Sequence, residues 1–171
     1  MNSQSPGPGK RRPATAAALN SRVARDSRTH PADLRLPDQR ELVAAFTAAE
    51  CEPAGQPLLT WANTLAHLHR RRHGDPLSTA GIDCRRAEVV ESIDRWVGAA
   101  ATAARTRRLR ADSLGTTIDR MAAAHVHANH LLHHCERVSD DRVHAAWYRL
   151  ALLADEWTDL VTGAEQVRRR S

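Results

Sequence analysis

The sequence predicts an all-α fold: an antiparallel up-down bundle of four main helices, preceded by a short N-terminal helix and a disordered tail. Three long segments each carry apolar residues at steps of three or four, which places those residues on one face of an α-helix. The connections between these segments are short, as is typical of antiparallel helical neighbours. The three apolar sets are Ile82, Val89, Ile93, Trp96 and Ala100; Leu114, Ile118, Met121, Ala128 and Leu132; and Val143, Trp147, Leu150, Ala154, Trp157 and Val161.

Residues 1–37 are predicted to form a disordered basic tail, because Ser, Pro, Gly, Ala and Arg dominate them and large apolar residues are scarce. Seven basic and two acidic residues place the whole net charge of +5 on this tail. The 18 basic and 18 acidic residues from position 38 onward cancel. Non-specific contact with nucleic acid is therefore expected only through the tail, and we rank it third among the possible functions.

The helical domain is predicted to span residues 38–167, followed by a basic C-terminal end at 168–171. Asp38 is a favourable N-cap, and Glu41 three residues later completes a capping box for the short first helix. Pro57 suits the first turn of the second helix. The four main helices are expected at about 57–72, 79–104, 113–138 and 139–163.

Several classes of protein are excluded or disfavoured by what the sequence lacks. No apolar run approaches the roughly 20 residues that cross a bilayer, and no secretory leader is recognisable, so we expect a cytoplasmic protein. Cys51, Cys84 and Cys135 are odd in number and lack C-x-x-C spacing, which favours reduced thiols. No phosphate-binding loop or nucleophile elbow is present, and no cofactor is expected. Arginine outnumbers lysine 24 to 1, which suggests GC-rich coding and an actinobacterial source.

The fourth main helix is rich in histidine. His127, His130 and His134 fall together on the face opposite its apolar stripe, at a spacing that could chelate Zn, Ni or Cu. Metal sites usually draw ligands from more than one element, and no carboxylate shares this face, so a solvated polar face is the favoured interpretation. His125 points inward and is expected to be a hydrogen-bonded core residue.

A second polar group is expected at one end of the bundle. Arg86 lies between the apolar Ile82 and Val89, and antiparallel folding about residues 105–112 would place Glu136 beside it. The same folding places His69 and Arg72 at this level. Because a buried arginine needs a partner, we predict an Arg86–Glu136 pair. The cluster of His69, Arg72, Arg86 and Glu136 is either an anion or small-ligand site, with His69 available for proton transfer, or a network that closes the core; the second interpretation is favoured.

Several stretches of the sequence resemble a known family. The most specific is Ile82-Asp83-Cys84-Arg85-Arg86-Ala87-Glu88-Val89-Val90, followed by Ile93-Asp94-Arg95-Trp96-Val97. Residues 65–72, Gly115-x-x-Ile118-Asp119-Arg120 and Ala146-Trp147-x-x-Leu150-Ala151 fit as well. Together, over about residues 57–167, they resemble the short actinobacterial members of the bacterial domain-of-unknown-function family DUF4254. The resemblance implies an all-helical fold and carries no established activity.

We therefore expect a non-catalytic protein-interaction or regulatory module whose partner is a protein, either another copy or a different chain. The alternative is a small-ligand or anion-binding protein, or a small enzyme, that uses the cluster at the end of the bundle. No catalytic residue is assigned.

Overall fold

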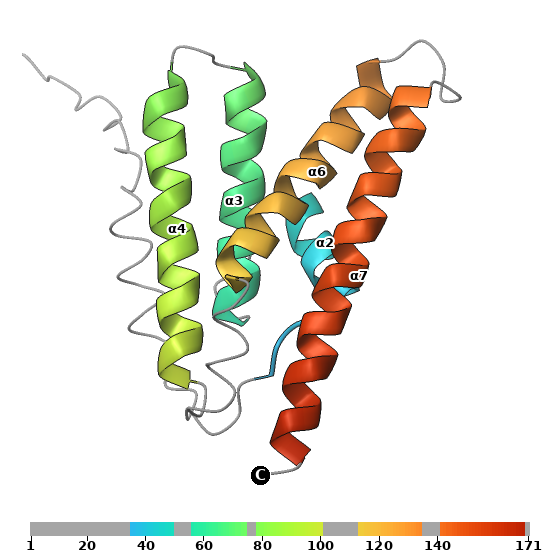
Figure 1. The fold of residues 1–171 in the computed structure, drawn as a ribbon. Coiled ribbons are helices and arrows are strands. Elements are labelled where there is room, and N and C mark those ends of the chain that lie inside the picture. Colours follow the sequence, from blue (N-terminus) through green and yellow to red (C-terminus); the bar gives the residue numbers. More distant parts are fainter. Residues whose placement is uncertain (1–34, 50–55, 75–77, 101–112, 135–140, 170–171) are drawn as a thin grey trace, which may run out of the picture.

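The computed structural model describes residues 35–49, 56–74, 78–100, 113–134 and 141–169. These residues form five α-helices and no strand, which confirms the all-α prediction (Figure 1). The helices are α2 (Gln39–Thr47), α3 (Pro57–Gly74), α4 (Thr79–Ala100), α6 (Leu114–His134) and α7 (Asp141–Arg169). Most of the predicted tail, the basic 105–112 connection, Cys51, Cys135, Glu136 and the last two residues lie outside the described residues.

Two contacts define how α3 and α4 lie together. Arg72, near the end of α3, bonds to Asp83 near the start of α4. At the opposite ends of the helices, the Trp61 and Trp96 rings meet edge to face, with centroids 6.1 Å apart. The two helices therefore run side by side in opposite directions, as Figure 1 shows.

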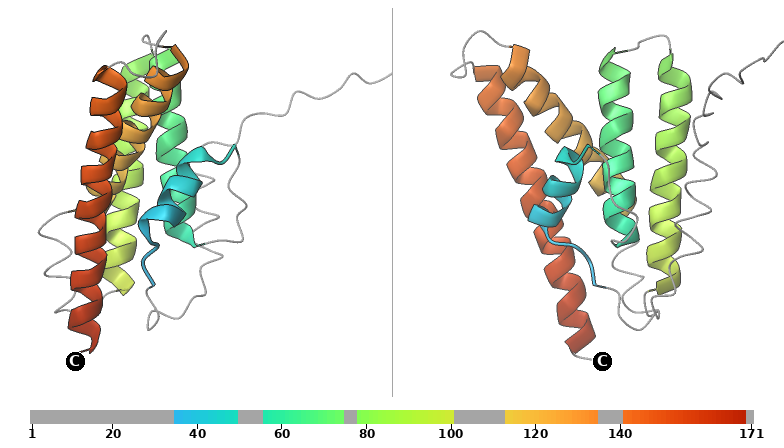
Figure 2. Two further views of the ribbon diagram at one scale, coloured as in Figure 1. Left: turned by 90° about the vertical axis from the view of Figure 1, so that its right-hand side faces the viewer. Right: turned by 180° about the vertical axis from the view of Figure 1, so that it is seen from behind.

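The helix α6 is inclined to this pair. It starts against α3 and α4 and rises obliquely toward α7, which lies along one edge of the molecule (Figure 1). The short α2 fills the angle between α3, α6 and α7, and its placement is clearest from behind (Figure 2). No helix in the described ranges is both long and apolar enough to cross a membrane.

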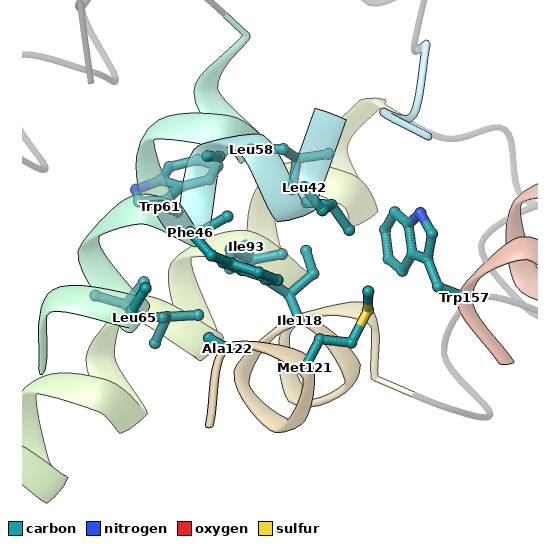
Figure 3. Packing of buried hydrophobic residues seen from close by; sticks show 14 of the residues in the cluster. Leu42, Phe46, Leu58, Trp61, Leu65, Ile93, Ile118, Met121, Ala122 and Trp157 are labelled. Carbon is teal, nitrogen blue, oxygen red and sulfur yellow. The ribbon is translucent and has the colours of Figure 1, made fainter. Parts of the chain in front are cut away.

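Side chains from all five helices meet in one core (Figure 3). The central side chains have no exposed area; they are Phe46 of α2, Leu58 of α3, Ile93 of α4, Ile118 and Met121 of α6, and Trp157 of α7. The Trp157 indole N–H donates to the carbonyl of Pro37 at 2.9 Å, so the chain just before α2 is fixed to α7. Leu36 and Pro37 are buried in this core, so the prediction that the tail extends to residue 37 is wrong at its last two residues.

The first helix begins as its sequence predicts. The Asp38 carboxylate accepts the Glu41 backbone N–H at 2.8 Å, and the Glu41 side chain accepts the Asp38 N–H at 2.8 Å. This reciprocal capping box satisfies N–H groups that the first turn leaves without a helical partner.

The other end of α2 is held by side chains of α3. The Asn63 amide donates to the carbonyls of Ala45 and Ala48, both at 2.9 Å. The Arg70 guanidinium donates to the Phe46 carbonyl at 2.8 Å. Because the last carbonyls of a helix lack partners within it, these bonds fix α2 on α3.

The first turn of α6 lies directly against α4. The Asp94 carboxylate of α4 accepts the Gly115 N–H at 2.9 Å and the Ser113 hydroxyl at 2.5 Å, so one helix caps the next. A Cβ on Gly115 would lie 2.6 Å from the Val90 carbonyl oxygen. Only glycine permits this approach, which sets the position of the second turn of α6.

Candidate functional site

The second turn of α6 places a carboxylate between three helices. Asp119 follows the fully buried Ile118 and faces α3 and α4. Its Oδ1 atom accepts His69 Nε2 at 2.8 Å and Arg86 Nε at 3.1 Å, and its Oδ2 accepts Arg86 Nη2 at 2.5 Å. Asp119 thus receives a two-pronged arginine contact from α4 and a histidine contact from α3, a geometry that favours strong charge-assisted bonding.

The network continues from Arg86 to the surface. Arg86 Nη1 donates to Asp83 Oδ1 at 2.8 Å, and Asp83 Oδ2 accepts Arg72 Nη2 at 3.4 Å. We call His69, Asp119, Arg86, Asp83 and Arg72 the polar cluster. Side-chain exposure rises along it, from 8% at His69 and 14% at Asp119 to 47% at Arg72. Its inner half is therefore part of the core, and its outer half meets water.

Electrostatics hold the inner pair in its charged form. Burial alone would raise the pKa of Asp119, but the hydrogen bonds and positive charges of His69 and Arg86 outweigh it and lower the pKa to about 2. The bonds to Asp119 and then to Asp83 raise the pKa of Arg86, against the opposing effect of its partial burial. Asp119 is therefore a carboxylate throughout the physiological range.

The members of the polar cluster bond to one another. Each guanidinium nitrogen of Arg86 donates to a carboxylate, and both oxygens of Asp119 accept. An incoming anion at Arg86 would meet two carboxylates that are already bonded to it, and their negative charge would oppose its binding. The Nδ1 atom of His69 has no hydrogen-bond partner among the described residues. The cluster thus joins α3, α4 and α6.

The structure brings together three of the four residues expected at this end of the bundle. His69 and Arg86 share Asp119, and Arg72 joins them through Asp83. Glu136 lies outside the described residues, so the Arg86–Glu136 pair stays a prediction. The described partners of Arg86 are Asp83 and Asp119. Asp119 can reach Arg86 because α6 is inclined, so that the first turns of α6 lie against α4 and its last turns do not (Figure 1).

Asp83 and Asp119 were not among the predicted site residues, yet the sequence carries a signal for both. The pair Ile-Asp occurs three times, at 82–83, 93–94 and 118–119. In each pair the isoleucine is buried. The aspartate of each pair accepts a hydrogen bond from a residue of a different helix. An aspartate beside a buried helical residue lies at the edge of the core, where it can reach a neighbouring helix.

The histidine face of α6 is exposed, as expected, and gains a member from α3. His73 stacks on His130 with ring centroids 5.1 Å apart, and His130 stacks on His134 at 4.1 Å. His127 lies 6.4 Å from His73, with its ring nearly parallel. Parallel rings direct their nitrogen lone pairs side by side and not to one point. Among the described residues, no group of three or more His, Cys, Asp or Glu side chains could hold a metal ion.

Two further histidine features bear on the electrostatics. Partial removal from water, then the charges of His130 and His127, lower the pKa of His73. His125 is buried against Phe46 and hydrogen-bonds to Asn129 at 3.1 Å, as predicted for a core histidine. Burial lowers its pKa, so His125 favours its neutral form.

One expectation for the last helix is wrong. Trp147 belongs to the predicted apolar stripe of α7, yet it is 38% exposed. At 100° per residue it lies about 60° from the buried Leu150, at the border of the stripe. Tyr148 and Leu152 are exposed further round the helix, at 67% and 51%. We define the α7 outer face as six exposed residues: His144, Trp147, Tyr148, Ala151, Leu152 and Asp155.

Comparison with known proteins gives one family. Residues 79–169, more than half of the chain, match the family described as "Protein of unknown function (DUF4254)". No curated protein and no solved structure matches the chain significantly. The matched segment contains α4, α6 and α7, with Asp83, Arg86 and Asp119; it excludes residues 65–72. The chain belongs to the DUF4254 family.

Proposed function

We propose that this DUF4254 protein is a non-catalytic interaction module that binds a protein partner through the α7 outer face. The observation that carries the proposal is the exposure of Trp147, Tyr148 and Leu152 within two turns of one helix. Single exposed apolar residues are ordinary, but a contiguous group with two aromatic members is typical of an interaction surface.

The polar cluster also favours an interaction module over a ligand-binding protein, because its members are bonded to one another. An anion bound at Arg86 would have to compete with two carboxylates, because Nε, Nη1 and Nη2 of Arg86 each already donate to Asp83 or Asp119. The charges of this region are used to join helices. The α7 outer face, by contrast, leaves 38% of Trp147 and 67% of Tyr148 exposed, and this aromatic surface is available to a partner.

A cytoplasmic location is part of the proposal. Cys84 is a free, exposed thiol, as is usual in a reducing compartment. The partner we expect is therefore another protein of the same compartment.

Site-specific photo-crosslinking tests this function. A photoreactive amino acid replaces Tyr148 in the full chain, and a matched variant carries it in place of the exposed Arg95 of α4. Crosslinking in the producing cells is expected to yield a discrete protein adduct from position 148 and none from position 95. Absence of an adduct at position 148, or equal adducts at both positions, contradicts the proposal.

A second candidate function is favoured by one observation: within the described ranges, the Nδ1 atom of His69 has no hydrogen-bond partner. A histidine oriented by a carboxylate can exchange a proton with a bound small molecule. Native mass spectrometry of gently purified protein tests this candidate. A reproducible additional mass that is lost in His69→Phe and kept in the exposed-site control His133→Phe supports it. A mass equal to that of the bare chain argues against it.

A further inference from the structure

We infer that the partner of the α7 outer face is a second copy of this chain, with the two α7 helices packed antiparallel across a two-fold axis between residues 149 and 150. This inference rests on the proposed function and specifies its partner. It follows from the order of residues on the face, from their sizes and charges, and from the place of α7 in the fold.

The α7 outer face is symmetric about its own midpoint. Its positions are 144, 147, 148, 151, 152 and 155. These six positions fall within an arc of about 140° on the helix, so all of them can face one partner. Each position has a counterpart at the same distance on the other side of the midpoint. A two-fold interface requires this kind of self-matching, because each residue meets its counterpart on the other subunit.

The counterparts fit one another in size. In the antiparallel register, Tyr148 faces Ala151 of the second copy, so a large ring meets a small side chain. Trp147 and Leu152 lie about 70° to either side of the middle of the face, so in the dimer each lies on one flank of the contact, beside its own counterpart on the second copy. The Tyr148–Ala151 pairs form the centre of the contact, with the two Trp147 rings on one flank and the two Leu152 side chains on the other.

The ends of the face fit in charge. His144 and Asp155 are both exposed and lie at opposite ends of the apolar group. The antiparallel register places each His144 opposite an Asp155, which permits two symmetric charge-assisted contacts. A parallel register would place each of these residues opposite its own copy, with two like carboxylates facing each other. The charges therefore select the antiparallel pairing.

The position of α7 leaves this face accessible. The opposite side of the helix carries Val143, Ala146, Leu150, Leu153 and Trp157, all buried. Trp157 is also bonded to Pro37, which fixes the helix on the body of the protein. Figure 1 shows α7 along the edge of the molecule, with its other flank away from α6 and α2. A second helix can thus approach without any rearrangement of the core.

Sedimentation equilibrium of the full chain tests the inference. A two-helix contact is at the small end of specific interfaces, so a dissociation constant of about 1–50 μM is expected and concentrations up to roughly 200 μM are needed. The wild-type chain is expected to sediment as a monomer–dimer equilibrium. Tyr148→Glu is expected to weaken association at least about tenfold, because it places a charge in the apolar centre.

A charge exchange tests the register. Asp155→Arg and His144→Asp are each expected to weaken association about three- to tenfold. The double variant His144→Asp, Asp155→Arg restores an opposite pair across the axis and is expected to recover most of the wild-type affinity. Glu91→Arg on the exposed surface of α4 is the control for net charge and is expected to leave association unchanged.

Three results would overturn the inference. The first is a monomer at all concentrations, and the second is a dimer that Tyr148→Glu leaves intact. The third is a dimer in which the double variant associates no better than either single variant. A monomeric chain that still yields a crosslink from position 148 to a different protein contradicts the inference that the partner is a second copy. The proposed function stands in that case. A monomer that yields no such crosslink contradicts both the self-association and the proposed function.

Discussion

The polar cluster and the α7 outer face reverse the usual distribution of residue types between core and surface. Asp119 and Arg86 are charged and largely covered, whereas Trp147, Tyr148 and Leu152 are apolar and exposed. In the first region every charge has a bonded partner on another helix. In the second, much of the apolar surface is left exposed by the described part of the chain. Covered charges that are already bonded to other helices of the same chain are explained by the fold. Exposed apolar side chains without such an explanation are the better indication of a binding function.

The two regions should differ in what mutation does to them. Removing a member of the polar cluster leaves a covered charge without its counterpart, which destabilises the monomer. Removing a member of the α7 outer face leaves the monomer core intact, so its effect should appear in association. Mutations that affect stability in one region and association in the other test this separation.

The largest effect is expected from Arg86→Met. The substitution keeps much of the side-chain volume but deprives Asp119 of its two-pronged partner, and the expected loss is about 3 kcal/mol of unfolding free energy. Urea denaturation measures this change. Arg95→Met, which breaks only the exposed pair with Glu91, is the control and should cost less than about 0.5 kcal/mol. Equal losses of unfolding free energy in the two variants would show that the polar cluster does not stabilise the fold.

A smaller loss is expected at the contact that positions Asp119. In Gly115→Ala the new methyl group meets the Val90 carbonyl oxygen at 2.6 Å, so α6 must shift away from α4 at a cost of about 2 kcal/mol. Gly81→Ala is the matched control, because nothing lies within 4 Å of its added Cβ. Alanine favours helix over glycine, so the control should be neutral or stabilised by up to about 1 kcal/mol. Stabilisation of both variants would contradict the close approach.

The polar cluster also predicts how stability depends on pH. The pKa of Asp119 is about 2 in the folded protein, against an ordinary value of 3.8. A lowered pKa stabilises the fold above about pH 4, and this contribution of about 2 kcal/mol is lost as the pH falls toward 2. Unfolding free energies measured from pH 6 to 2.5 should therefore fall less steeply in Asp119→Asn than in the wild type. Asp159→Asn, on the exposed surface and outside the α7 outer face, should retain the wild-type slope.

The smallest effect on the monomer is expected from the α7 outer face. Leu152→Ala should change the unfolding free energy of dilute protein by less than about 0.5 kcal/mol, because the side chain is 51% exposed. Leu150→Ala, two positions earlier on the same helix, removes a side chain that is 5% exposed and should cost about 2–4 kcal/mol. If Leu152→Ala approaches the cost of Leu150→Ala, the α7 outer face belongs to the monomer core.

The sequence predicted the parts of this fold that local periodicity determines. The helical stripes follow from spacing, and the Asp38–Glu41 capping box follows from local chemistry. The inclination of α6 does not, because it depends on the close approach of Gly115 to α4 and on the Asp94 cap. That inclination decides which residue faces Arg86. Periodicity therefore identified Arg86 as inward, while its partners Asp83 and Asp119 required the packing of three helices.

The same limit explains Trp147. Its spacing from Leu150 is that of a stripe residue, but the width of the buried side depends on how many helices cover α7. With α6 and α2 as its neighbours, the buried side is too narrow to include Trp147. An exposed tryptophan at the edge of a stripe is thus a feature that only the tertiary arrangement reveals.

One thermal-unfolding experiment separates the roles of the two regions: the midpoint temperature of the wild type and of Tyr148→Glu, each measured over a range of protein concentrations. Association of folded chains raises the midpoint with concentration, so the wild-type midpoint should rise. The Tyr148→Glu midpoint should stay constant and equal the wild-type value at low concentration, because the outer face contributes to association and not to the monomer fold. A constant wild-type midpoint, or a variant midpoint well below the dilute wild-type value, would contradict this division of roles.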